Sequence, residues 1–416
     1  MGLKPIKVLE EIDKLRDWGL ETLTKMISVP TVSPLGDRYE EFKNLIVEEL
    51  SHVGITPKVI TVPSEVVKES LGPEPAKYPR YIIIAKVGSG PTFHLNGHYD
   101  VVPGGSGWTV TEPFKPKVID GKVYGRGSTD MKGGIASALL TLLALMKFES
   151  HLNFTYEVAM VPDEEVGGKS GTGYLVKSGI SKPKYVVIAE GSSTRSVWIG
   201  HKGIVWGRVI VRGRPAHAST PWLGVNAFEK GVEVAQLFIK ELKPRIESKV
   251  SKYEYDIKEG KKATIMFGGV VKGGAKINQV PSEFTFTFDR RVLPEESVEE
   301  VWREIKGFTN ELRRRGYDID VELISSSNPV VTEPTTDLVI KLKEAAKEVI
   351  GIEPRATVCI GGLDMRYYIE AGYKAVTYGP GMLKTAHAPD EFIVYEDVIK
   401  VAKVYALTAL KLFNLA

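Results

Sequence analysis

The stretch Val161-Pro-Asp-Glu-Glu-Val-Gly167 places three adjacent acids, Asp163, Glu164 and Glu165, directly after the apolar run 156–161, which predicts a buried strand. Three neighbouring carboxylates repel one another, so a fold that gathers them at a strand end has to supply a cation or a proton there. Adjacent side chains at a strand end point to opposite sides, so one glutamate can bind a metal ion while the other faces a substrate. Three acids alone are more simply a solvated turn, and only partners elsewhere in the chain favour a site.

Strands and helices alternate on both sides of this stretch. Apolar spacing predicts helices at 8–27, 39–52, 135–146, 337–350 and 396–412, and apolar runs predict strands at 81–87, 92–96, 156–161, 185–189 and 375–378. The predicted strands run into polar residues. We therefore expect an α/β fold with a mostly parallel central sheet flanked by helices, and a site at the carboxyl ends of the strands.

The pattern changes near Gly203. Strands are predicted at 204–211, 263–268, 283–290 and 318–324, and helices at 225–240 and 295–314. The order β-α-β-β-α-β matches the ferredoxin-like α+β motif. Because the α/β pattern resumes afterwards, we expect a catalytic domain in two parts, 1–203 and 326–416, with an inserted domain at 204–325. The charged segment 243–262 is predicted to be an exposed excursion on the insert.

Composition narrows the class of protein. A chain of 416 residues favours two domains, and a net charge of +3 from nearly balanced acids and bases indicates neither a nucleic-acid partner nor an anionic lipid surface. The single cysteine, Cys359, excludes an intramolecular disulfide and suits a reducing compartment. The N-terminus has no signal-peptide pattern, and the longest apolar run, 135–146, is too short to span a bilayer. We expect a cytoplasmic enzyme without a membrane partner.

Two candidate ligands precede the acids in the chain. His98 and Asp100 share a face of an extended segment, so the Asp100 carboxylate can accept a hydrogen bond from one ring nitrogen of His98 and leave the other free for a metal ion. Asp130 lies between a glycine-rich loop and the helix 135–146, where main-chain amides favour a carboxylate. Singly, His98 is as simply a structural histidine and Asp130 a helix N-cap.

Two more candidates follow the acids. Glu190 ends the strand 185–189, although every strand ends in something polar, and His387 lies in a loop before the last helix. Carboxylates and imidazoles at several strand ends suit a divalent ion, and mixed nitrogen and oxygen ligands favour zinc. Five residues supply enough ligands for two ions that share one carboxylate and a water: His98, Asp130, Glu165, Glu190 and His387. Glu164 then remains to act as a base.

These motifs together resemble the co-catalytic dizinc amidohydrolases and metallopeptidases that include acetylornithine deacetylase, succinyl-diaminopimelate desuccinylase, aminoacylase and glutamate carboxypeptidase. The matching stretches run in family order over nearly the whole chain: Gly97-His-Tyr-Asp-Val-Val-Pro103, Gly125-Arg-Gly-Ser-Thr-Asp-Met-Lys-Gly-Gly134, Asp163-Glu-Glu165, Ala189-Glu190, Ala216-His-Ala218, Asn278 with Pro281, Asp289-x-Arg291, Gly361-Gly-Leu-Asp364 and Gly379-Pro-Gly381 with His387. As a series they are highly specific.

The resemblance implies metal ligands. His98, Asp130 and Glu190 would hold one ion, and Asp130, Glu165 and His387 the other, with Asp130 bridging. Two zinc ions are expected first, and cobalt or manganese suits the same ligands. Similar enzymes also have a cis peptide bond after the bridging aspartate, here between Asp130 and Met131.

The resemblance also implies catalytic roles. Glu164 would be the general base toward a metal-bridging hydroxide, and Asp100 would orient His98. The insert would be a lid and a dimerisation surface, from which His217 reaches a catalytic site, often that of the partner subunit, and stabilises the oxyanion. Arg291 and Asn278 are candidates for binding the substrate carboxylate, because a guanidinium can hold it through two hydrogen bonds. A surface arginine and a turn asparagine are their simpler interpretations.

The function implied is hydrolysis of the amide bond of an N-acyl amino acid, because a glutamate at position 190 goes with deacylases and carboxypeptidases of this family and an aspartate with aminopeptidases and dipeptidases. A metallocarboxypeptidase or general aminoacylase, cleaving short peptides or N-blocked amino acids, is the alternative. An inactive binding relative is a third, disfavoured because every ligand and Glu164 are present. We expect a homodimer acting on a small molecule.

Overall fold

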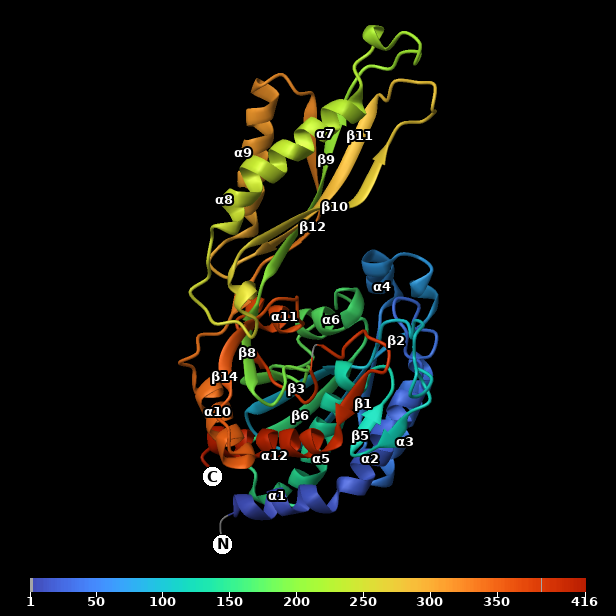
Figure 1. Cartoon of the computed structure of the whole chain (residues 1–416). Coiled ribbons are helices and arrows are strands. Elements are labelled where there is room, and N and C mark those ends of the chain that lie inside the picture. The colour runs from blue at the N-terminus through green and yellow to red at the C-terminus, as the bar shows by residue number, and fades with distance from the viewer. Residues whose placement is uncertain (1–2, 383) are drawn as a thin grey trace. The chain divides into compact units, whose positions relative to one another are not determined.

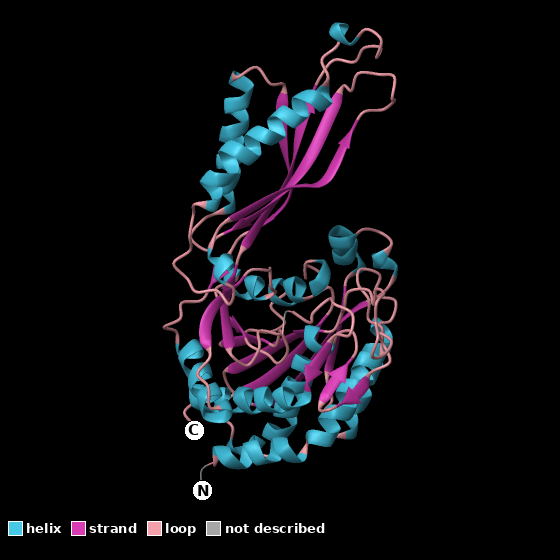
Figure 2. Ribbon diagram, viewed as in Figure 1, coloured by secondary structure: helices cyan, strands magenta, loops and turns pink. Residues whose placement is uncertain are grey.

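The computed structural model of the chain describes residues 3–382 and 384–416. These divide into two compact units (Figures 1 and 2). The first comprises the chain up to Ile199, Thr332–Ala356 and Leu363–Ala416, and the second comprises Gly200–Val331 and Thr357–Gly362. The predicted insert, 204–325, falls within the second unit, which begins a few residues earlier and also takes in a short segment from the later part of the chain.

A mixed sheet forms the centre of the first unit (Figure 1). Its strands follow the order β1-β2-β6-β3-β7-β15-β8, with β14 paired to β8. Their bounds are β1 Lys58–Val62, β2 Arg80–Gly88, β3 Thr92–His98, β6 Thr155–Val161, β7 Tyr185–Ile188, β8 Ser196–His201, β14 Arg355–Cys359 and β15 Lys374–Thr377. The central strands β6, β3, β7 and β15 are parallel to their neighbours in this series, so their carboxyl ends lie along one edge.

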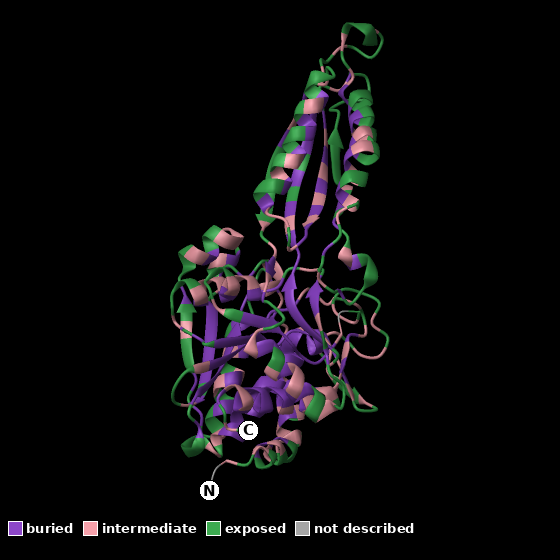
Figure 3. Cartoon of the chain, turned by 90° about the vertical axis from the view of Figure 1, so that its left-hand side faces the viewer, coloured by how far each residue is buried: buried purple, intermediate pink, exposed green. Residues whose placement is uncertain are grey.

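Helices cover both faces of this sheet, which is why β3, β6 and β7 are buried along almost their whole length (Figure 3). Helices α5 (Gly133–Met146) and α12 (Tyr395–Leu412) pack together on one face, and α6 (Thr172–Lys177) and α11 (Met365–Glu370) lie on the other (Figure 1). The remaining helices of this unit are α1 Pro5–Lys14, α2 Arg16–Ser28, α3 Tyr39–His52, α4 Ser64–Leu71 and α10 Asp337–Ile350.

The turn Ser128–Lys132 lengthens the apolar run of α5. Together they make Ser128–Met146 long and apolar enough to cross a membrane by length and composition. The apolar run in the structure is therefore longer than the run 135–146 from which we expected no membrane span. Within the structure, 89% of this window is buried. The segment therefore serves as the core helix of the first unit.

The second unit is a four-stranded antiparallel sheet with two helical segments on one face (Figure 2). The strand order is β10-β11-β9-β12, from β9 (Gly203–Arg212), β10 (Thr264–Gly273), β11 (Glu283–Val292) and β12 (Ile319–Ser327). Helix α7 (Ala227–Leu237) leads through a wider turn into α8 (Lys243–Glu247), and α9 (Val298–Arg314) precedes β12. This is the chain order that the sequence predicts for a ferredoxin-like motif.

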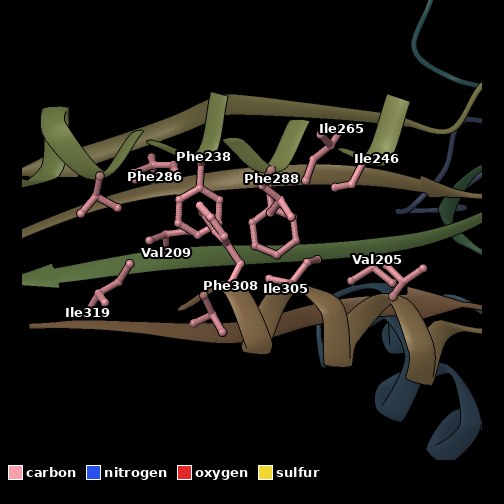
Figure 4. Close-up of a cluster of buried hydrophobic side chains, with 14 of the residues drawn as sticks. Val205, Val209, Phe238, Ile246, Ile265, Phe286, Phe288, Ile305, Phe308 and Ile319 are labelled. Atoms are coloured by element: carbon pink, nitrogen blue, oxygen red, sulfur yellow. The ribbon is translucent and has the colours of Figure 1, made fainter. Parts of the chain in front are cut away.

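The core of the second unit lies between its sheet and its helices (Figure 4). On β11 the buried residues Phe284, Phe286 and Phe288 alternate with less buried ones, as expected when only one face of a sheet is covered (Figure 3). Phe238 packs edge-on against Phe286 and Phe308 from the two layers. Burying such rings contributes roughly 1.5–3 kcal/mol each, so this core can stabilise the unit.

The charged segment 243–262 is mostly exposed, as predicted, but it is anchored. Tyr255 is buried and pairs in parallel with Val358. The ammonium group of Lys202 donates a hydrogen bond to the carbonyl of Lys262 and lies over the Tyr255 ring. This segment therefore holds Thr357–Gly362 in the second unit. The pairing joins residues about a hundred positions apart, which a local charge pattern cannot reveal.

The structure differs from the predicted elements at short strands, at one predicted helix, and at the short helices α4 and α11, which the sequence did not predict. The predicted helix 8–27 is two helices, because the chain leaves helical geometry at Leu15. Besides β1, β8 and β14, the sequence missed β4 (Lys117–Ile119), β5 (Lys122–Tyr124), β13 (Val330–Val331) and β16 (Phe392–Val394). Strands of two or three residues carry too little periodicity to predict.

Candidate metal centre

Four adjacent strands of the first unit bring the predicted ligands to one edge of the sheet. His98 ends β3, Glu165 follows β6, and Glu190 follows β7. His387 lies in the loop after β15. Asp130 reaches the same edge from the turn before α5, and the bond between Asp130 and Met131 is cis, as expected. Carboxyl ends of neighbouring parallel strands are where open α/β sheets carry their sites.

The five side chains form two groups that share Asp130. The ligand atoms of His98, Asp130 and Glu190 all lie within 4.8 Å of one another, and so do those of Asp130, Glu165 and His387. The two carboxylate oxygens of Asp130 face different groups. Oδ1 lies 3.0 Å from Nε2 of His98, and Oδ2 lies 3.1 Å from Nε2 of His387. This is the arrangement that a bridging carboxylate requires.

Both histidines face two carboxylates with a single nitrogen. His98 Nε2 lies 3.0 Å from Asp130 and 3.3 Å from Glu190, and His387 Nε2 lies 3.1 Å from Asp130 and 3.0 Å from Glu165. A neutral imidazole nitrogen has one hydrogen and cannot satisfy both partners. Ligands about 2.0–2.2 Å from a tetrahedral Zn²⁺ stand roughly 3.3–3.6 Å apart, close to these separations. The donor set therefore fits a divalent ion at each group.

The charges of the cluster also fit metal ions. Burial, with the neighbouring charge of Asp130, raises the pKa of Glu190 to about 8. Burial and Asp130 likewise raise the pKa of Glu165 above its ordinary value. Hydrogen bonds that the His387 ring donates to the carboxylates of Asp130 and Glu165 raise the pKa of His387 to about 10. Raised pKa values on acids and a base together mean that protons balance an excess of negative charge, which is the charge that divalent ions neutralise when they displace those protons.

The cluster opens to solvent at one end. His98 and Glu190 are buried, Asp130 and Glu165 are half-buried, and the side chain of His387 is 51% exposed. A substrate would therefore approach from the side of His387.

Asp100 supports the cluster in a different way from the one we expected. The ring nitrogen Nδ1 of His98 donates to the main-chain oxygen of Asp100 at 2.9 Å, whereas the nearer carboxylate oxygen of Asp100 stands 3.4 Å away. That carboxylate accepts hydrogen bonds from the main-chain N–H groups of Glu164, at 3.0 Å, and Glu165, at 3.1 Å. Asp100 thus fixes both the ring of His98 and the turn that carries the two glutamates.

The three adjacent acids have different partners and therefore different roles. Asp163 is buried and pairs with the equally buried Arg80, whose Nε lies 3.0 Å from Oδ2 of Asp163. Tyr39 and Ser170 also donate hydrogen bonds to this carboxylate. Glu165, two residues further along the chain, turns toward His387. The cation that the acidic stretch requires is thus, for Asp163, an arginine.

Glu164 stands beside the cluster without belonging to either ligand group. Burial raises the pKa of Glu164 well above its ordinary value, and the negative charges of Asp364 and Glu165 add to this effect. Asp364 is buried, accepts a hydrogen bond from Thr172 at 2.5 Å, and leaves its Oδ1 without a hydrogen-bond partner among the described residues. The sequence quoted Asp364 within a glycine-rich motif but indicated no role for it.

The second unit carries the other predicted site residues, and it brings only two of them together. His217 pairs with Gln279, and the N–H of Ala218 donates to the carbonyl of Asn278 at 3.1 Å, so His217 and Asn278 lie on adjoining loops. Arg291 lies near the other end of β11, where it pairs with Ile204 of β9.

Between Glu283 and Arg291, β11 extends for about 26 Å, at about 3.3 Å per residue. The Arg291 guanidinium makes two hydrogen bonds of 3.0 Å to Asp289. Within one second unit, therefore, Arg291 and Asn278 cannot hold the same small carboxylate.

Comparison with known proteins agrees with this site. A model of peptidase family M20/M25/M40 matches residues 94–411. An uncharacterized metallohydrolase of Methanocaldococcus jannaschii is 32% identical, over 79% of this chain and 82% of its own length. The succinyl-diaminopimelate desuccinylase of Wolinella succinogenes is 26% identical, over 91% of this chain and 95% of its own.

The fold is shared with solved structures. An M20 family metallo-carboxypeptidase from Sulfolobus solfataricus matches with a TM-score of 0.72 and 21% identity, over 96% of this chain and 99% of its own. The likeness confirms the predicted α/β fold class. At this identity it says nothing of the substrate.

Proposed function

The chain belongs to peptidase family M20/M25/M40, as its motifs predict, and from this premise we propose that it hydrolyses the amide bond of an N-acyl amino acid. Membership makes it a metal-dependent hydrolytic enzyme that acts on amide or peptide bonds. The observation that carries the proposed hydrolytic chemistry is the pair of ligand groups that share Asp130, with Glu164 beside them.

Two divalent ions fit the two groups. His98, Asp130 and Glu190 would hold one, and Asp130, Glu165 and His387 the other. Imidazole and carboxylate ligands favour zinc, with cobalt or manganese as alternatives. Such ions polarise a carbonyl oxygen and lower the pKa of a water molecule.

Glu164 is the proposed general base. Its carboxylate takes a proton from the attacking water as the water oxygen bonds to the amide carbon. It then delivers that proton to the amine nitrogen as the carbon–nitrogen bond breaks. A pKa raised by burial suits a group that must both accept and return a proton. The Asp100 carboxylate keeps Glu164 in place by accepting a hydrogen bond from the main-chain N–H of Glu164.

His217 is the proposed oxyanion donor. The main-chain N–H of Ser219 donates to Nδ1 of His217 at 3.2 Å, so the neutral ring carries its proton on Nε2. The ring is exposed, which leaves Nε2 able to donate to a substrate oxygen. Asn278, on the adjoining loop, would bind the substrate from the same side.

The separation of Arg291 from His217 supports a homodimer. Arg291 pairs with Ile204, close to Gly200, where the chain enters the second unit. His217 and Asn278 lie near the opposite end of β11. We infer that His217 and Asn278 serve the site of a partner subunit, whereas Arg291 binds the substrate carboxylate at the other site of the dimer.

The substrate class follows from two features. Glu190 goes with deacylases and carboxypeptidases in the resemblance that the motifs carry, and the desuccinylase relative covers almost the whole chain. The same resemblance includes carboxypeptidases, so cleavage of short peptides is the second candidate. The same ligand groups and base serve both reactions.

The test is hydrolysis by zinc- or cobalt-loaded protein of N-acetyl-ornithine, N-succinyl-diaminopimelate, N-acetyl-methionine and a benzyloxycarbonyl-blocked dipeptide. A strong preference for one acylated diamino acid supports the deacylase. Cleavage of the blocked dipeptide at a comparable rate supports the carboxypeptidase instead. No hydrolysis of any of the four by metal-loaded protein would overturn this substrate class.

A further inference from the structure

One buried acid near the cluster, Glu391, has no part in the mechanism proposed above. Glu391 follows His387 in the chain by four residues, and its side chain is fully buried. Its carboxylate accepts hydrogen bonds from three main-chain N–H groups of the loop that carries Asp130. Oε2 accepts from Gly127 at 3.0 Å, and Oε1 accepts from Thr129 at 2.9 Å and from Asp130 itself at 3.1 Å.

The loop needs this acceptor because its backbone is irregular. Gly127 has a φ of 85°, and Asp130 and Met131 have non-helical angles within the turn before α5. N–H groups in such a turn have no carbonyl partner supplied by a regular helix, and a buried N–H without an acceptor is costly. One carboxylate with two oxygens supplies the acceptors for all three.

Arg126 connects the same carboxylate to the other metal-binding loop. Its Nη1 lies 2.6 Å from Oε2 of Glu391, and both side chains are buried. Its Nη2 donates to the main-chain oxygen of His387 at 3.3 Å. The pair Arg126–Glu391 thus holds the main chain at Asp130 and at His387, two ligands that come from distant parts of the sequence.

From these contacts we infer that Glu391 is a positioning residue: it sets the bridging carboxylate of Asp130 against His387 before a metal ion binds. Its own main chain is fixed independently. The Glu391 carbonyl accepts from the N–H of Gly125, and the next residue, Phe392, pairs with Tyr124 on β5. Replacing the side chain therefore leaves the strand pairing in place and changes only what the loop N–H groups and Arg126 meet.

Glu391→Gln is the sharpest variant. Each oxygen of Glu391 accepts two hydrogen bonds, Oε1 from Thr129 and Asp130 and Oε2 from Gly127 and Arg126. In either orientation, the amide NH2 of glutamine would face two donors. Substituting a residue that supports a metal ligand typically weakens metal affinity by about 10–100-fold. Because Asp130 belongs to both groups, we expect both ions to bind about 10–100-fold more weakly.

The matched control is Glu157→Gln. Glu157 is another buried carboxylate of the first unit, bound to His94 and Ser181 near the start of β6 and away from the ligand edge. Zn²⁺ affinity of the metal-free proteins would be measured by competition with a chelator, well below their melting temperatures. Glu157→Gln should lower the melting temperature and leave the affinity unchanged. Wild-type affinity in Glu391→Gln would overturn the inference.

His98→Ala separates this inference from the proposed metal site on which it rests. If His98→Ala also left Zn²⁺ affinity unchanged, the metal site itself would fail; if only Glu391→Gln did so, only the positioning role would fail.

Amide hydrogen exchange of the metal-free wild-type protein tests the role without any substitution. The N–H groups of Gly127, Thr129 and Asp130 should exchange as slowly as those of α5. Fast exchange that slows only when Zn²⁺ is added would show that metal, not Glu391, orders the loop.

Discussion

Two charged groups, His387 at the carboxyl edge of the first unit's sheet and Arg291 on the sheet of the second unit, have partners at very different distances along the sequence. In the first unit, His387 contacts Glu165, which lies 222 residues away in the sequence. In the second, Arg291 pairs with Asp289, two residues away on the same strand. The ligand cluster therefore exists only when the whole sheet has formed, whereas the Arg291 pair needs only β11.

This difference indicates where each region obtains its function. Contacts between neighbouring strands that are distant in the sequence make a site whose metal ligands all come from one chain. The local pair of Arg291 leaves its binding role to be completed by a substrate or by another subunit. We therefore expect changes in the first unit to remove metal or chemistry, and changes in the second to alter oxyanion stabilisation and substrate binding.

The largest effect is expected for Asp130→Ala, because Asp130 belongs to both ligand groups. The variant should lose both ions on dialysis, and turnover should fall to the background of the assay. His387→Ala, which touches only one group, should retain one ion more firmly than the other. Metal analysis after dialysis checks this. Two ions retained by Asp130→Ala would contradict a shared ligand.

Glu164→Gln should separate chemistry from metal binding. Glutamine cannot accept the proton, so kcat should fall by about 10²–10⁴-fold, the usual contribution of a general base. Because Glu164 belongs to neither ligand group, metal content should stay at the wild-type level. Steady-state kinetics with metal analysis measures both. Near-normal kcat would remove Glu164 from the proposed role.

The metal ligands were the predictable part of the site, because each follows an apolar strand or a glycine-rich turn and parallel strands end along one edge. The acidic stretch itself was not fully predictable. Nothing local distinguishes Asp163 from its neighbours, and its partner Arg80 lies 83 residues earlier. Only the folded sheet shows that one of the three acids is structural.

The second unit was predictable as a motif but not as a set of contacts. Its β-α-β-β-α-β order can be seen from periodicity, whereas the distance between Asn278 and Arg291 depends on β11 running fully extended between them. Glu391 was equally hidden. The residue itself can be seen in the sequence, in the loop after His387. Its role could not be predicted, because its three main-chain donors lie some 260 residues earlier.

A mixed-dimer experiment tests whether His217 of the second unit acts at the catalytic site of the partner subunit or at that of its own chain. His217→Ala alone should lower kcat by about 10²–10³-fold, as loss of an oxyanion donor does. Mixed with Glu164→Gln and allowed to exchange subunits, it should regain activity, because one site of each mixed dimer receives an intact Glu164 and an intact His217. Random association would restore about a quarter of wild-type activity. No recovery in a verified mixed dimer would place His217 at its own chain's site.

The smallest effect is expected for Arg291→Ala, because Asp289 already occupies two of the guanidinium donors. A hydrogen bond to a charged group contributes about 1.5–3 kcal/mol, so KM for a carboxylate substrate should rise by roughly 10–100-fold with kcat little changed. Arg208→Ala is the matched control, since Arg208 makes a similar pair with Glu322 on the same sheet. Steady-state kinetics of both variants decides the point. An equal, small change in the two would make Arg291 a surface arginine, and the second unit would then bind substrate through its loops alone.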